Sequence, residues 1–269
     1  MGRRISGGER WPETTAGRRG AARSMGRGAG RGPRVAADTT CEALMNEPKE
    51  HLAEMLLLAA HVLTEAMETP RACDALYVMA HVPETEDSLL RGAVALWERL
   101  SRAPKILLCA DGPASGFAGG AAWQRKLRDE LGVPGSAIVL VGGAQYESDD
   151  RRPALNSATE APPVIRWCRE HGVAHLTVVA HHFHVLRAYL GFVTAGREVA
   201  SLQISPYAVA ALARDGRHTH SQGTLTSTLP ELVESEIAKC FAYRNLVRPG
   251  EARAITLSRY RRARLRKVL

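Results

Sequence analysis

The sequence lacks several signatures that would assign a function directly. The segments G-x-G-x-x-G, G-x-x-x-x-G-K-[ST] and G-x-S-x-G are absent, which weighs against ordinary dinucleotide, P-loop and serine-hydrolase chemistry. The apolar run from Met55 to Ala60 is far shorter than the ~20 residues of a membrane-spanning helix. Five cysteines make an odd number, with no C-x-x-C pair. We therefore expect a reducing, cytoplasmic setting and no membrane span.

The full chain has a net charge of +8, but the body of the chain is not positively charged. Residues 1–37 contain nine Arg against two Glu, and residues 250–269 contain six Arg and one Lys against one Glu. The intervening residues 38–249 therefore carry a net charge of −5. Because non-specific nucleic-acid binding depends on positive charge, the sequence predicts no nucleic-acid partner for the folded body.

Composition divides the chain into three parts. Residues 1–40 are rich in Gly and Arg and poor in large apolar side chains, which predicts a disordered extension. Residues 45–249 are predicted to form a single α/β domain. Residues 250–269 form a basic C-terminal tail, for which a solvated terminus is favoured over a packed helix.

Apolar runs of strand length alternate with helical patterns from residue 47 onward. Pro162 and Pro163 are expected in the first turn of their helix, where proline is tolerated. Continuous apolar strands separated by helices predict a Rossmann-like three-layer α/β/α sandwich with a mostly parallel sheet. The predicted strands are 74–81, 105–110, 137–141, 175–180 and 198–205, and the predicted helices are 47–67, 87–102, 119–131, 159–171, 183–195 and 229–246.

Polar residues and glycines follow the predicted strands at their carboxyl ends, where ligands bind in such sheets. A single glycine there is more simply a turn residue. Several glycines at one edge allow close backbone approach and offer N–H groups to an anion. Their convergence with a carboxylate and several imidazoles predicts a ligand site formed by His81, Asp111, Gly112, Gly142, Gly143, His181, His182 and His184.

His184 and Arg187 lie three residues apart at the start of the predicted helix 183–195. They share a face near the positive end of the helix dipole, which predicts an anion pocket. Two alternatives remain: a pair of solvated residues, or an arginine that braces the fold through a buried carboxylate such as Glu160. His220 carries no pattern and is interpreted as a surface or helix-end residue.

Five segments between about residues 74 and 207 resemble the YdcF-like family, an envelope-associated domain of unknown function. They are D-A-L-Y-V-M, A-D-G, L-G-V-P, N-S-A-T-E-A and V-V-A-H-H-F-H-V-L-R-A. The resemblance implies a Rossmann-like fold, and it places Asn156 and Glu160 in one pocket with the F-H-x-x-R-A segment. It also implies a link to cell-envelope metabolism and S-adenosylmethionine as a candidate cofactor. This chain departs from the family pattern with G-G-A-A at 119–122, where an acidic residue is usual.

The sequence is compatible with two functions from different classes, one catalytic and one not, and it does not decide between them. The first is a hydrolase or transferase acting on a phosphorylated or nucleotide-like metabolite. In it, His181 is the proton donor and Asp111 or Glu160 the general base. The second is a non-catalytic module that binds a nucleotide or S-adenosylmethionine. In both, the small anionic ligand is held by Gly112, Gly142, Gly143, Asn156, His184 and Arg187.

A metal-dependent hydrolase using His182, His184 and Asp111 ranks last. The H-x-H pattern does occur in metal sites, but nothing in the sequence fixes a third ligand at a known spacing. We therefore expect no metal.

Overall fold

The computed structural model describes residues 48–113, 116–142, 157–210, 212–220, 226–243 and 246–265, with side chains as far as Arg259. All of them belong to one compact unit, residues 35–269. The predicted disordered extension and two predicted site residues, Gly143 and Asn156, lie outside the described residues.

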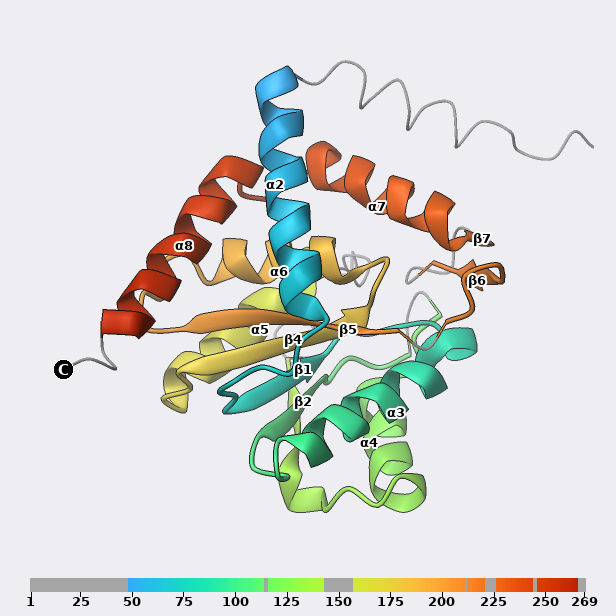
Figure 1. Cartoon of the computed structure of the whole chain (residues 1–269). Helices are drawn as coiled ribbons and strands as arrows, with labels where there is room; N and C mark the ends of the chain where they lie inside the picture. Colours follow the sequence, from blue (N-terminus) through green and yellow to red (C-terminus); the bar gives the residue numbers. More distant parts are fainter. Residues whose placement is uncertain are drawn as a thin grey trace, which may run out of the picture. The chain divides into compact units, whose positions relative to one another are not determined.

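A sheet of five parallel strands lies at the centre of this unit (Figure 1), in the order β3-β2-β1-β4-β5. Helices connect the successive strands, so the predicted Rossmann-like α/β fold is confirmed. The chain moves outward from β1 to β3 and then returns to place β4 on the other side of β1. The strands are β1 (Ala75–Val78), β2 (Lys105–Cys109), β3 (Ile138–Val141), β4 (His175–His181) and β5 (Gln203–Val209).

Helices cover both faces of the sheet. One face packs against α3 and α4, and the other packs against α2, α5 and α6. Helices α7 and α8 contact α6 from outside, and α8 also contacts α2 (Figure 1). The helices are α2 (Lys49–Ala66), α3 (Pro83–Arg99), α4 (Gly120–Arg125), which continues as a π-helical turn η1 (Lys126–Glu130), a short 3-10 turn η2 (Gly135–Ala137), α5 (Ser157–Glu170), α6 (Val185–Ala195), α7 (Leu229–Ala242) and α8 (Pro249–Leu265).

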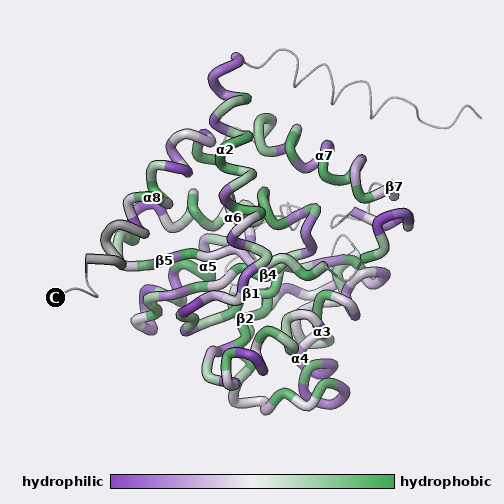
Figure 2. The backbone as a smooth tube through the Cα atoms, viewed as in Figure 1, coloured by the Kyte–Doolittle hydropathy of each residue, from purple (hydrophilic) through white to green (hydrophobic). Residues whose placement is uncertain are grey.

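The strands are apolar on both faces because both faces are covered. Along β1, Leu76 and Val78 pack toward α3 and α4, whereas Ala75 and Tyr77 pack toward α2, α5 and α6. In Figure 2, hydrophobic residues, coloured green, make up much of the central strands. No helix within the described ranges is both long and apolar enough to span a bilayer.

Several predicted elements differ in position from those observed, among them α3, which begins at Pro83 rather than at residue 87. Strand β5 begins at Gln203 rather than at residue 198, and it runs through Pro206. Proline is tolerated there because β5 is an edge strand. Helix α5 begins at Ser157, so Pro162 and Pro163 lie in its second turn rather than in its first.

The C-terminal segment also differs from the solvated terminus that the sequence favours. Helix α8 buries Ala252, Thr256 and Arg259. The Arg259 guanidinium donates to the Gly196 carbonyl oxygen at 2.6 Å, and the hydroxyl groups of Thr256 and Tyr189 lie 2.7 Å apart. The many basic residues of this helix favoured a solvated terminus, although three residues on one side of the helix are buried.

Gly119 and Gly120, in the G-G-A-A segment that departs from the YdcF-like pattern, have a steric explanation. A Cβ atom on Gly120 would lie 1.9 Å from the Cys109 carbonyl oxygen, and Gly119 has a φ of +96°. The start of α4 is therefore packed directly against the end of β2, which only glycine permits.

Candidate functional site

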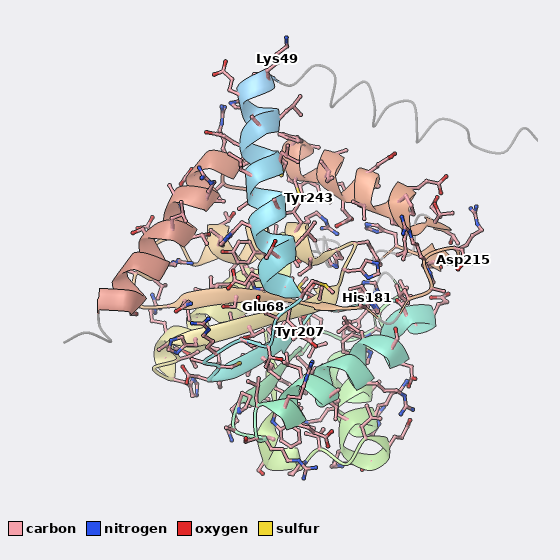
Figure 3. All side chains as sticks on the ribbon, viewed as in Figure 1. Lys49, Glu68, His181, Tyr207, Asp215 and Tyr243 are labelled. Carbon is pink, nitrogen blue, oxygen red and sulfur yellow. The ribbon has the colours of Figure 1, made fainter. Side chains whose placement is uncertain are left out.

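The carboxyl ends of β1 and β4 lie side by side at the point where the strand order reverses. Ligands bind at this switch point in open parallel sheets. His81 follows β1, and His181 ends β4. The antiparallel hairpin of β6 (Arg217–Thr219) and β7 (Thr226–Thr228), which the sequence did not predict, follows β5 beyond the same edge. Figure 3 labels His181 between α3 and this hairpin.

Three histidines, which we call the imidazole cluster, gather at this edge: His81, His181 and His184. The ring centroids of His81 and His181 are 4.8 Å apart, and those of His81 and His184 are 5.8 Å apart. The Phe183 ring stacks on His181 at 6.0 Å. The exposed fractions of the three histidines are 0%, 0% and 2%. The ends of β1 and β4 and the residue that precedes α6 therefore bring together histidines separated by about a hundred positions in sequence.

Part of the hydrogen-bonding capacity of the cluster is unused. His81 Nδ1 lies 2.7 Å from the Thr85 hydroxyl, His181 Nε2 donates to the Thr85 carbonyl oxygen at 3.0 Å, and His184 Nε2 lies 3.3 Å from the Ser157 hydroxyl. Within the described residues, the buried atoms His81 Nε2 and His184 Nδ1 have no hydrogen-bond partner. Buried polar atoms normally have a partner, so these two atoms mark a position where a ligand or water would be stabilised.

The imidazoles are neutral at neutral pH. Burial lowers the pKa of His181 to about 4. Burial also holds the pKa of His81 and of His184 well below the usual value, and the nearby Arg187 charge lowers that of His184 further. Each neutral ring offers one donor and one acceptor nitrogen. His184 therefore contributes hydrogen bonds rather than the positive charge that an anion pocket would use.

Arg187, predicted to hold a ligand anion, has an internal partner. Its guanidinium is fully buried, and its Nε atom donates to Glu236 Oε2 at 2.6 Å. Its Nη1 atom donates to the Ser157 hydroxyl at 3.2 Å. This matches the alternative of an arginine that braces a buried carboxylate, but the carboxylate is Glu236 of α7 rather than Glu160. The charge of Arg187 is thus balanced inside the protein.

Glu236 collects several donors besides Arg187. His220 contacts Glu236 Oε1, and the Lys239 ammonium lies 3.3 Å from the same oxygen. Burial alone would raise the pKa of Glu236, but Arg187 and His220 outweigh it and hold the pKa well below its usual value. The interpretation of His220 as a surface residue is wrong, because its side chain is buried against α7. The ion pair therefore ties the start of α6 to α7 and to the hairpin.

Glu160 lies on the other face of the sheet from His181. Its Oε2 atom accepts hydrogen bonds from the Tyr77 hydroxyl at 2.8 Å and from the Ala80 N–H at 3.0 Å. Burial raises the pKa of Glu160 to about 7, although both hydrogen bonds counteract this. His181 contacts α3 through Thr85 instead. Glu160 and the imidazole cluster meet through the adjacent residues Ala80 and His81.

Three further predicted residues, Asp111, Gly112 and Gly142, follow strands β2 and β3 at the rim of this edge. Asp111 follows β2, where its Oδ2 atom accepts a hydrogen bond from the Cys109 thiol at 3.3 Å. Gly112 is exposed, and a Cβ atom there would have no neighbour within 4 Å. Gly142 has a φ of +95°, which favours glycine. Gly143 and Asn156 lie outside the described residues.

Sequence reasoning missed Glu236, although a signal was present. Leu229, Leu232, Glu236 and Cys240 follow the spacing of one helix face and are all buried. A carboxylate at an apolar position of an amphipathic helix indicates a buried ionic partner. The identity of that partner, Arg187, is not encoded locally.

No family model, curated protein or solved structure matches this chain. The resemblance to the YdcF-like family therefore rests on the quoted segments alone. Across the described part of the chain, no group of three or more His, Cys, Asp or Glu side chains has an arrangement suited to a metal ion.

Proposed function

We propose that the protein binds a small anionic or nucleotide-like molecule at the carboxyl edge of its sheet and acts on it by acid–base chemistry, as a hydrolase or transferase of a phosphorylated metabolite. The observation that carries this proposal is the presence of buried ring nitrogens, among them His81 Nε2 and His184 Nδ1, that have no partner within the described ranges and lie at the switch point of the sheet. An orphaned buried polar atom is unfavourable unless a ligand or water completes it.

Proton transfer is assigned to Glu160, supported by the pKa of about 7 that burial gives its carboxyl group. A group that titrates near the working pH exists in both forms and is an effective general acid or base. Asp111 at the rim is a secondary candidate for proton transfer. His181 in the cluster is another secondary candidate, because a neutral imidazole is a poor proton donor at pH 7.

Anion binding is assigned to backbone groups rather than to Arg187, whose charge Glu236 neutralises. Helices α3, α5 and α6 each follow a strand of the sheet, so their N-termini lie at its carboxyl edge. Helix N-termini provide unpaired N–H groups and a favourable dipole for a phosphate. The neutral imidazoles then orient the rest of the ligand through hydrogen bonds.

The experiment is phosphate release from a panel of phosphorylated metabolites by the full chain. Glu160→Gln is expected to lower turnover by roughly 10²–10⁴-fold, the usual contribution of a general acid or base. With Glu160 as the base, wild-type activity rises with pH through about 7. His175→Gln is the matched control, because His175 lies at the opposite edge of the sheet and is partly exposed. Equal losses in both variants would contradict the assignment of Glu160.

A non-catalytic module that binds a nucleotide or S-adenosylmethionine is the second candidate. The neutrality of the imidazole cluster favours it, because neutral donor and acceptor nitrogens complement the edge of a purine ring better than a phosphate. Native mass spectrometry of the purified protein tests for such a ligand. A retained nucleotide-like molecule without turnover of the panel supports this candidate over the enzyme.

A further inference from the structure

Helix α2 has two apolar faces, of which the fold uses one. Met55, Leu58, Val62 and Ala66 are buried, and this face packs against β5, α6 and α8. Much of the opposite side is also apolar but lies open to solvent. A helix that is apolar on both sides is normally buried on both sides, so the second face calls for a partner.

The exposed face has the spacing of a coiled-coil seam. We call it the α2 seam: Ala53, Leu56, Ala60, Leu63 and Met67, which follow one another at alternating intervals of three and four residues. Alternation of three and four is the pattern by which one helix packs along another. Leu56 is 71% exposed, Leu63 43% and Met67 67%, and Leu57 beside the seam is 51% exposed.

We propose that the α2 seam binds the α2 seam of a second copy of this chain in an antiparallel arrangement. Two exposed residues of opposite charge lie at the two ends of the seam: Lys49, which is beside the exposed Glu50 at the start of α2, and Glu68 just after its end. Figure 3 labels them at the two ends of the helix. A parallel pair would place like charges together, whereas an antiparallel pair places each lysine beside a glutamate and opposes the helix dipoles.

The antiparallel arrangement also matches side-chain sizes. With Lys49 of one copy opposite Met67 of the second copy, the seam sets each leucine against an alanine: Leu63 against Ala53, and Leu56 against Ala60. Alternation of large and small residues lets two helix faces interdigitate. The pairing is symmetric, as a closed two-fold dimer requires. Residues 1–40, which come before α2 in the chain, are rich in Gly and Arg and poor in large apolar residues, so they offer no comparable apolar face.

Sedimentation velocity of the full chain tests this proposal, with a dimer expected in the micromolar range. Leu56→Glu and Leu63→Glu should each raise the dimer dissociation constant by roughly a hundredfold or more, because two copies of an unpaired charge enter the interface. Glutamate favours helix, so α2 itself should persist. Leu257→Glu on α8 is the control, since Leu257 is also exposed, at 37%, but lies outside the seam.

A monomeric wild-type chain, or equal dissociation by the seam and control variants, overturns the proposal. The orientation has its own test. Lys49→Glu should raise the dissociation constant roughly three- to tenfold, as expected for two exposed ion pairs, and the double variant Lys49→Glu/Glu68→Lys should restore it. Failure of the double variant to recover affinity overturns the antiparallel arrangement.

Discussion

The two edges of the parallel sheet present opposite environments on the same five strands. At the amino edge, Asp74 Oδ2 accepts the N–H groups of Ala174 and His175 at 2.9 and 2.8 Å, and the Lys105 ammonium donates to the Ser136 carbonyl oxygen at 2.8 Å. These side chains are exposed to water. At the carboxyl edge, by contrast, ionic and imidazole groups are almost fully buried.

The amino edge carries polar groups that satisfy backbone hydrogen bonds, whereas the carboxyl edge carries buried ionisable groups that folding does not require. Each amino-edge contact satisfies a backbone group near a strand end, which is an ordinary structural role. The carboxyl edge instead concentrates a buried ion pair, a carboxyl group with a pKa of about 7 and ring nitrogens without a partner among the described residues. Burial of this kind is unfavourable for folding, and it clusters at functional sites.

The largest expected effect tests the buried ion pair. Arg187→Ala should lower the free energy of unfolding by about 3–5 kcal/mol, because it removes the buried guanidinium beside Glu236 and leaves that buried carboxylate to His220 and the partly exposed Lys239. Urea unfolding measures this loss. The double variant Arg187→Ala/Glu236→Ala should lose less than the sum of the two single variants. Lys105→Ala at the amino edge serves as the control, with a change below ~1 kcal/mol. A similar small change for Arg187→Ala would remove the contrast between the edges.

An intermediate effect concerns pH. The folded pKa of Glu160 is raised to about 7, so the folded state binds its proton more tightly than the unfolded state does. This contribution to stability is complete below about pH 4.5 and is lost as the pH rises through about 7. Its full size is about 3 kcal/mol at 1.36 kcal/mol per pKa unit.

Glu160→Gln should remove this pH dependence. The stability of the variant relative to wild type should rise by about 3 kcal/mol between pH 4.5 and pH 8. Unfolding at several pH values measures the difference, in which the contributions of the buried histidines cancel. A difference that stays constant with pH would show that Glu160 does not titrate in this range.

The smallest expected effect lies at the amino edge. Asp74→Ala should lower the free energy of unfolding by about 1 kcal/mol, because two exposed backbone N–H groups exchange the carboxylate for water. Ligand binding and turnover should be unchanged. Thermal melts and the phosphate-release assay test both statements. A loss of activity with unchanged stability would extend the functional region to the amino edge and blur the comparison.

Sequence patterns predicted the strands at the centre of the sheet well and those at its margins less well. β1, β2, β3 and β4 are short apolar runs because two helical layers bury them, and such runs are visible locally. The sequence predicts the fifth strand at 198–205, which ends before Pro206, whereas β5 runs through that proline. A proline is tolerated in a strand at the edge of a sheet, and edge position is a property of the assembled sheet. The short strands of the β6–β7 hairpin carry no apolar alternation that would reveal them.

Some features of the candidate site were also predictable from the sequence, and others were not. The gathering of His81 and His181 at one edge followed from strand direction alone, because parallel strands end together. That Arg187 is paired with Glu236 was not predictable, since the two residues lie 49 positions apart in sequence. The separation of Glu160 from His181 was also hidden, because it depends on which face of the sheet each helix covers.

The sequence by itself determined the alternation of strands and helices, the parallel sheet and the edge at which its polar residues collect. These follow from local periodicity and from the direction of the chain, which each segment reports without its neighbours. Only the tertiary structure decided which charges are neutralised, which ring nitrogens remain unpartnered among the described residues and which face of α2 stays exposed. Those properties depend on burial and on partners distant in sequence, because the pKa of a side chain and its hydrogen bonds are set by the groups that surround it in space.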